Sequence, residues 1–275
     1  MKTLLIIGGG AEQVPAYEAA KKRGLTIVGT DMDAAAPALH LADHVLLAST
    51  RDADETVEKI LQFSKNYKID GVMTIANDVP YTVARVANVL NLPSISVESS
   101  LLFTNKLLMK DAFFKSGVAC PWFTGVESIE QFVDAVHDRA KQKYVLKPTD
   151  GRGARGVLII DGDIDLSWAF NESKSWGESG QLILEKFVDG MQLSTESFLL
   201  DGVCYTPAIS ARNYARTDQF KPNIIEDGGT IPADISDDLY VDINDLILRG
   251  AKALGITHGL VKGDLVIDKN GKPQI

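Results

Sequence analysis

The sequence predicts an α/β protein that changes to α+β in its second half, and three observations support this class. The first hundred or so residues alternate short β-branched strands with amphipathic helices, the middle carries a glycine-rich turn, and the last third contains two hairpin signals. At 275 residues the chain is long enough for two domains. We expect a Rossmann-like domain over residues 1–98, a lid subdomain over 99–183 and a further, incomplete subdomain over 184–275.

The chain opens with the pattern of a doubly wound sheet. An apolar strand at residues 3–7 runs into three glycines at 8–10, and a helix over about 12–23 leads to a second strand at 26–30. The glycines lack the last glycine of the dinucleotide fingerprint. We therefore expect a substrate-facing loop at this strand end, with a nicotinamide-dependent enzyme as the alternative.

Two further strand–helix pairs complete the first domain. They are predicted as strands at 44–47 and 71–75 and helices at 54–66 and 80–90. Asn77 and Asp78 follow the last strand, at the edge where open α/β sheets bind ligands, although helix capping would explain one of them equally well. His40 and His44 have no third metal ligand nearby, so we expect them to be packing or surface residues.

A helix with two lysines on one face begins the second half. It is predicted to follow Thr104 as its N-cap and to end at Gly117. Lys106 and Lys110 are four residues apart, and a solvated basic face is the ordinary explanation of such a pair. Lys106, however, lies in the first turn, where the helix dipole disfavours a cation unless an anion is nearby.

The glycine-rich turn at residues 147–157 is the most informative stretch. It lies between two apolar strands and contains Gly151, Gly153 and Gly156 together with Lys147, Arg152 and Arg155. Bare backbone and cations suit a polyphosphate, and they stand out in a chain of net charge −9. An exposed hairpin with solvated charges is the alternative. A P-loop is excluded, because no Gly-Lys-Ser/Thr follows and the flanking elements are both strands.

The last third is predicted to be a sheet of hairpins. Strands at 192–200 and 203–211 flank Asp201-Gly202, and a helix over about 239–254 follows. A second hairpin turns at residues 269–272, and the sequence stops as its second strand begins. Because a strand edge would then stay unpaired, we expect the chain to be a fragment.

The composition and the apolar pattern argue against nucleic-acid and membrane partners. A net charge of −9 and a pI of about 5.0 argue against nucleic acid. The apolar run after Met1 is too short for a signal peptide, and no run reaches the roughly 18 apolar residues needed to span a bilayer. Cys120 and Cys204 show no metal or redox spacing and fit reduced thiols. We expect a cytoplasmic protein without a membrane or nucleic-acid partner.

The order of these segments resembles the ATP-grasp superfamily, in particular its carboxylate–amine ligases and the carbamoyl-phosphate-synthase-like branch. The resemblance rests on the helix with Lys106, on Lys147 with its glycine loop, on Glu185-Lys186-Phe187-Val188, and on the hairpin sheet with Asp264. It covers nearly the whole chain. It implies a pre-ATP-grasp domain followed by an ATP-grasp domain with a lid.

The resemblance also implies a set of ligand contacts. ATP would be bound by Lys106, Lys147, Gly151, Arg152, Gly153, Gly156, Glu185, Lys186, Val188 and Gln192. In this set the lysines and the loop hold phosphates and the segment 185–188 holds adenine. Gln192 stands where many members have Glu or His for the ribose, which puts that contact in doubt. Asp264 looks like the first acidic Mg²⁺ ligand, and the second acidic segment, expected after Gly271, is absent.

The implied activity is that of an ADP-forming ligase. ATP would activate a small-molecule carboxylate as an acyl phosphate, and an amine would capture it. Arg212, Lys262 and Glu196 are expected at the same cleft as catalytic residues, with exposed ion pairs as the alternative explanation. Homodimers are common in the family, so the resemblance implies a possible homodimer. A nucleotide-binding protein without catalysis is the alternative function.

Overall fold

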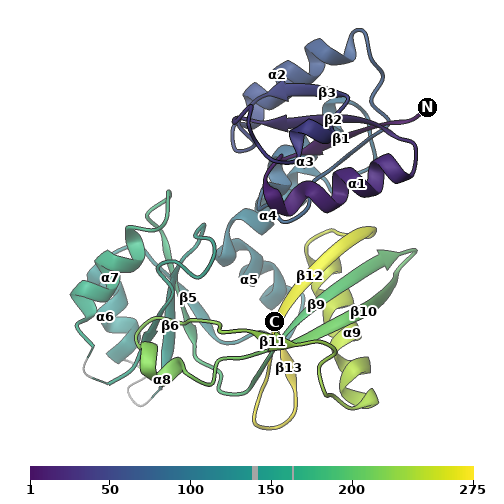
Figure 1. The fold of residues 1–275 in the computed structure, drawn as a ribbon. Helices are drawn as coiled ribbons and strands as arrows, with labels where there is room; N and C mark the ends of the chain where they lie inside the picture. The colour runs from purple at the N-terminus through teal and green to yellow at the C-terminus, as the bar shows by residue number, and fades with distance from the viewer. Residues whose placement is uncertain (138–141, 163) are drawn as a thin grey trace. The chain divides into compact units, whose positions relative to one another are not determined.

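A computed structural model describes residues 1–137, 142–162 and 164–275. The chain divides into two compact units, Met1–Leu101 and Leu102–Ile275, each with its own sheet structure (Figure 1). The α/β class of the first unit and the α+β class of the second are both confirmed. Within the described residues, no helix combines the length and apolarity needed to cross a bilayer.

The first unit is a four-stranded parallel sheet with strand order β3-β2-β1-β4. The strands are β1 (Thr3–Ile7), β2 (Thr26–Asp31), β3 (His44–Leu47) and β4 (Gly71–Met73). The helices are η1 (Ala11–Gln13), α1 (Val14–Lys22), η2 (Leu39–Leu41), α2 (Ala53–Ser64) and α3 (Pro80–Val89), and α4 (Val97–Thr104) crosses the division between the units.

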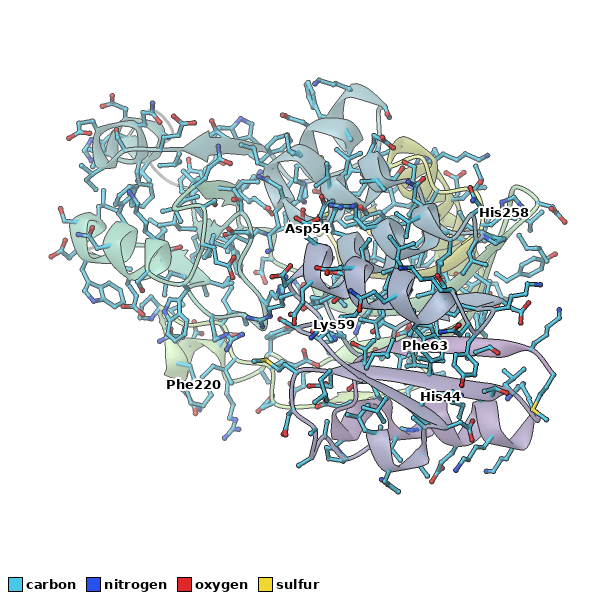
Figure 2. All side chains as sticks on the ribbon, turned by 90° about the horizontal axis from the view of Figure 1, so that it is seen from above. His44, Asp54, Lys59, Phe63, Phe220 and His258 are labelled. Carbon is cyan, nitrogen blue, oxygen red and sulfur yellow. The ribbon has the colours of Figure 1, made fainter. Side chains whose placement is uncertain are left out.

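Helices cover both faces of this sheet because β1 is apolar on both. Leu5 and Ile7 pack with Ile60 of α2, whereas Ile6 faces the other way and packs with Tyr17 of α1. All of these side chains are buried. On edge strand β3 the ring of His44 lies 5.2 Å from that of Phe63 (Figure 2), so its expected packing role is confirmed.

The second unit contains two sheets. The first has antiparallel order β5-β8-β6-β7, and we call it the lid sheet after its predicted role. Its strands are β5 (Phe123–Val126), β6 (Tyr144–Pro148), β7 (Leu158–Ile160) and β8 (Leu182–Lys186), and its helices are α6 (Ile129–His137) and α7 (Leu166–Lys174). Phe132 of α6 and Phe170 of α7 form its core with Tyr144 and Leu182. The two strands that flank the glycine loop, β6 and β7, pair directly.

The second sheet has order β11-β10-β9-β12-β13. Its strands are β9 (Met191–Leu200), β10 (Val203–Arg212), β11 (Gly229–Thr230), β12 (Gly259–Ile267) and β13 (Pro273–Gln274), and the remaining helices of the unit are α5 (Lys106–Lys115), α8 (Thr217–Phe220) and α9 (Asp237–Ala253). Both predicted hairpins are confirmed, and the positive φ angles of Asp201 (49°) and Gly202 (80°) match a tight hairpin turn.

The predicted cap of α5 is wrong by one residue. Thr104 is the last residue of α4, and Asn105 caps α5 instead. The Asn105 side chain accepts hydrogen bonds from the amides of Leu107 and Leu108 at 2.9 and 3.2 Å. Asn is among the preferred N-cap residues, and an apolar helix directly before the cap was not predicted.

Gly190, the residue before β9, tests the packing of the second sheet. A Cβ at this position would overlap the carbonyl oxygen of Ile267 in β12, so we expect Gly190→Ala to lower the free energy of unfolding by about 2 kcal/mol or more. Chemical denaturation followed by tryptophan fluorescence measures this unit selectively, because Trp122, Trp168 and Trp176 all lie in it.

Gly250→Ala is the matched control. Gly250 lies inside α9 and a Cβ there would meet its nearest atom at 3.5 Å, so this substitution should leave stability unchanged or raise it slightly. A Gly190→Ala protein as stable as the wild type would contradict the packing described for β9 and β12.

Candidate nucleotide and metal site

A buried carboxylate with two lysines lies at the centre of the second unit. Glu185 of β8 is 6% exposed, and its Oε1 lies 2.7 Å from the Nζ of Lys147 on the neighbouring strand β6. Its Oε2 lies 3.5 Å from the Nζ of Lys110 on α5, which is 5% exposed. With both lysines protonated, this Glu185 cluster carries a net charge of +1, which suits a bound anion.

The electrostatics of the cluster are those of a coupled buried group. Burial alone would raise the pKa of Glu185, but the ammonium groups of Lys147 and Lys110 outweigh it and lower that pKa. Burial lowers the pKa of Lys110, and Glu185 opposes this shift. Lys110 Nζ also donates a hydrogen bond of 2.7 Å to the carbonyl oxygen of Ile275.

The glycine loop begins next to this cluster and is fixed at its base. The buried Thr149 accepts a 2.8 Å hydrogen bond from the amide of Lys106, and Lys106 Nζ donates to the carbonyl of Gly151 at 2.6 Å. The Asp150 carboxylate accepts a 2.7 Å hydrogen bond from the amide of Ser179. The structure therefore brings both predicted phosphate lysines to one loop.

The far end of the loop needs glycine for its conformation. Gly153 and Gly156 have φ angles of 62° and 69°, and Ala154 between them has 59°. A Cβ at Gly156 would also lie 3.0 Å from the carbonyl oxygen of Ser173. The carbonyl of Arg152 accepts a hydrogen bond from the Arg155 side chain at 3.2 Å. The loop thus presents backbone between two fixed ends.

The predicted adenine segment, residues 185–188, begins in the last two residues of β8. Lys186 is exposed and donates its amide hydrogen bond to the carbonyl of Trp122 at 2.8 Å, and the amide of Phe187 donates to Lys143 at 2.9 Å. Val188 and Gln192 are partly buried. Gln192 pairs with Val266 of β12. Because Gln192 lies two residues before Ser194 on β9, both are on the same sheet face, which is also the face of the predicted metal ligand Asp264.

The predicted metal ligand, Asp264, lies on the face of the second sheet that points away from α9. Asp264 of β12 is in register with Ser194 of β9. Arg212, the last residue of β10, places its Nη2 2.8 Å from Asp264 Oδ1 and 3.1 Å from Ser194 Oγ. Its Nη1 donates to Glu226 Oε2 at 2.9 Å. Arg212 therefore bridges two carboxylates.

Glu226 is a site residue that sequence reasoning missed. The predicted polar loop over 212–232 contains it, but its position beside Arg212 depends on how that loop closes. The amide of Asn213 donates to Gly228 at 2.7 Å, and Arg212 pairs with Gly229 of β11. The adjacent acidic residues Glu226 and Asp227 were the only available signal.

These residues fit a magnesium ion bound together with phosphate. Asp264 and Glu226 offer the hard oxygen ligands that Mg²⁺ prefers, and the guanidinium of Arg212 between them shows that the position accepts a cation. Within residues 1–137, 142–162 and 164–275, no three His, Cys, Asp or Glu side chains are grouped to bind a metal by themselves. This agrees with magnesium sites in which one or two carboxylates are completed by phosphates and water.

Lys262 and Glu196 occupy the next row of the same sheet face. They are paired in register, and their Nζ and Oε1 atoms lie 3.9 Å apart, with side chains 58% and 63% exposed. An exposed pair of this kind contributes little to stability. It is therefore available to a ligand that approaches Asp264, two residues along β12.

In the first unit the strand order reverses between β1 and β4, which is the kind of edge where open α/β sheets bind ligands. Gln13 Nε2 donates to the carbonyl of Ile75 at 2.8 Å and so ties the loop after β1 to the loop after β4. The amide of Gly9 donates to Asp31 at 2.9 Å. The capping explanation for Asn77 and Asp78 is wrong, because α3 is capped at Val79 without a side-chain hydrogen bond.

Comparison with known protein families finds a match for each of the two parts of the chain. A model of the ATP-grasp domain matches residues 103–275, and a model described as a PylC-like N-terminal domain matches residues 4–88. The resemblance inferred from the sequence is thereby confirmed. The protein y4rH of Sinorhizobium fredii, described as uncharacterised, is 26% identical over 235 residues, which cover 82% of this chain and 47% of that protein. The chain thus spans about half the length of this curated relative.

Solved structures show the same fold over the whole chain. Phosphoribosylglycinamide synthetase from Anaerococcus prevotii gives a TM-score of 0.75 at 24% identity, covering 100% of this chain and 66% of that one. N5-carboxyaminoimidazole synthetase from Staphylococcus aureus, solved in complex with ADP, gives 0.79 at 17% identity, covering 99% and 68%.

The Glu185 cluster makes a prediction about stability and pH. Glu185→Gln leaves the buried ammonium of Lys110 and the partly buried ammonium of Lys147 without their carboxylate, so we expect a loss of about 3–5 kcal/mol in the free energy of unfolding at pH 7. Because the folded pKa of Glu185 is lowered, the stability that its charge contributes is present above its ordinary pKa and is lost as the pH falls through the folded value. The difference between the two proteins should therefore shrink in acid.

Denaturant titrations at pH 7 and at progressively lower pH measure this difference. The exposed Glu178→Gln is the matched control and should match the wild type throughout. A Glu185→Gln protein with wild-type stability at pH 7 would show that the cluster is not a coupled buried group.

Proposed function

The chain belongs to the ATP-grasp family, and we infer from this premise that it uses ATP to join a small-molecule carboxylate to an amine, releasing ADP and phosphate. The observation that carries the proposal is the Glu185 cluster beside the glycine loop. With both lysines protonated, it combines a net positive charge in the second unit with a backbone loop tied to Lys106. A polyphosphate satisfies both features.

Each part of the site then has a role. Lys106 and Lys147 bind phosphate oxygens, and the backbone of the loop over residues 151–156 covers them. The segment 185–188 holds the adenine, and Gln192 lies where the ribose would pass along the sheet face. Phosphoryl transfer needs positioning and neutralisation of charge more than it needs a protein nucleophile. The proposed groups are of the type that this reaction requires.

Magnesium would be held by Asp264, with Glu226 as the second available carboxylate. When bound, it neutralises charge on the transferring phosphoryl group. Arg212 would bind an oxygen of the same group, and the exposed Lys262 and Glu196 would orient the carboxylate and amine substrates.

The reaction balances without a protein nucleophile. The substrate carboxylate attacks the terminal phosphorus of ATP, and the bond to ADP breaks, which gives an acyl phosphate. The amine attacks the acyl carbon, phosphate leaves, the amine loses a proton, and an amide bond forms. Residues 99–183 would act as the lid over 184–275.

The relatives support this class of chemistry. One solved neighbour is a phosphoribosylglycinamide synthetase, and another is an N5-carboxyaminoimidazole synthetase with bound ADP. We propose ATP and Mg²⁺ as cofactors and a cytoplasmic location for this chain. The activity proposed is that of the whole protein, because the chain spans only part of these relatives.

A nucleotide-binding protein without catalysis is the second candidate function. One observation favours it: the predicted metal ligand Asp264 is paired with the Arg212 guanidinium instead of being open to a metal ion. In that case the protein would bind ATP without any carboxylate or amine stimulating ADP release.

Titration with ATP and Mg²⁺ tests the proposed site. Lys147→Ala removes a cation from the phosphate site, so we expect the Kd for ATP to rise about 10- to 100-fold. Lys143→Ala removes a lysine just before the same strand, where it pairs with Asp161 at the surface, and should not change the Kd. Binding that survives Lys147→Ala would place the nucleotide elsewhere.

A further inference from the structure

We propose that Arg212 is a phosphate ligand held in reserve by Asp264 and Glu226, so that it engages ATP only when a divalent cation occupies these two carboxylates. The inference rests on the proposed function and deepens it, because it names the residues that make nucleotide binding depend on metal. Glu226 is then a positioning residue that acts through Arg212.

Both arms of the Arg212 guanidinium are occupied. Nη1 lies 2.9 Å from Glu226 Oε2, and Nη2 lies 2.8 Å from Asp264 Oδ1. Nη2 also donates to Ser194 Oγ at 3.1 Å, and Ser194 Oγ in turn donates to the same oxygen of Asp264 at 3.1 Å. A phosphate oxygen must displace at least one of these acceptors to form a two-armed contact with this arginine.

The backbone fixes this arrangement. Arg212 is the last residue of β10 and pairs with Gly229, so the loop between them closes directly beside its side chain. A Cβ at Gly229 would crowd the carbonyl oxygen of Ala211, which shows how closely the two strands approach. Glu226 lies three residues before Gly229, within this closed base.

The local charge gives the arrangement its dependence on metal. Arg212, Asp264 and Glu226 together carry +1 − 2 = −1, so the site repels metal-free ATP. A divalent cation at the two carboxylates changes the sum to +1 and leaves the guanidinium with only the Ser194 hydroxyl as an acceptor. The arginine and the cation can then both face phosphate, which is the charge pattern that phosphoryl transfer requires.

A purely structural ion pair makes a different prediction. If Glu226 only held the loop in place, its neutralisation would disturb the loop and weaken ATP binding equally with and without metal. If Glu226 holds Arg212 in reserve, its neutralisation should strengthen metal-free binding. The two explanations thus differ in the sign of the effect.

The experiment measures the Kd for a fluorescent ATP analogue in EDTA and in Mg²⁺, for wild type and Glu226→Gln. Glutamine keeps the shape and one acceptor oxygen but removes the charge. We expect the metal-free Kd to fall about three- to tenfold at low salt, and the ratio between metal-free and Mg²⁺ values to shrink by at least that factor. Glu226→Asp, which keeps the charge, should restore a wild-type ratio.

Asp218→Asn is the matched control. It removes the same charge from the same loop, but at a carboxylate that pairs with Lys221 at 2.7 Å and is 88% exposed. Both of its Kd values should equal those of the wild type. Binding of Mn²⁺ without nucleotide, measured by electron paramagnetic resonance, should be weaker in Glu226→Gln and unchanged in Asp218→Asn.

Three results would overturn the inference. Glu226→Gln could leave both Kd values unchanged, or raise both by one factor, or match Asp218→Asn in every measurement. Each of these leaves the proposed function intact as long as wild type binds ATP with Mg²⁺. Wild type that binds no ATP under either condition would instead contradict the proposed function, and the inference with it.

Discussion

The second unit depends on one buried carboxylate. Glu185 is charged at a position that water hardly reaches, and such a charge is tolerated only when cations neutralise it. Lys147 supplies one cation from the neighbouring strand and Lys110 the other from α5. The same contacts hold α5 against the lid sheet, and with both lysines protonated they leave one surplus positive charge at the start of the glycine loop. The contacts that stabilise the unit are therefore also those of the proposed anion site.

A single segment connects the end of β10, next to the predicted metal ligand Asp264, to the lid sheet. The segment between β10 and β11 starts at Arg212, beside Asp264, and reaches the lid strand β7, where the amide of Ile159 donates to Pro222 at 2.7 Å. Strand β7 directly follows the glycine loop. The segment that starts beside Arg212 therefore contacts the strand that follows the glycine loop.

Local patterns were enough to predict most of the fold. The glycine loop between β6 and β7, the turn at Asp201-Gly202 and the parallel opening of the chain all follow from short-range signals. The contacts that give the site its chemistry were not predictable in this way. The pairing of Lys110 with Glu185 joins residues 75 apart in sequence, and Glu226 reaches Arg212 only through loop closure. The prediction of Thr104 as a helix cap was wrong because Thr104 is the last residue of the preceding helix α4.

Hydrogen exchange with and without ATP and Mg²⁺, resolved by mass spectrometry, tests the central claim most directly. If the nucleotide lies against the Glu185 cluster, amides at residues 149–157 and 185–188 should gain protection, because the phosphates bind loop N–H groups and the base covers the end of β8 and the two residues after it. Protection confined to residues 8–13 would place the nucleotide on the glycines of the first unit and contradict the account.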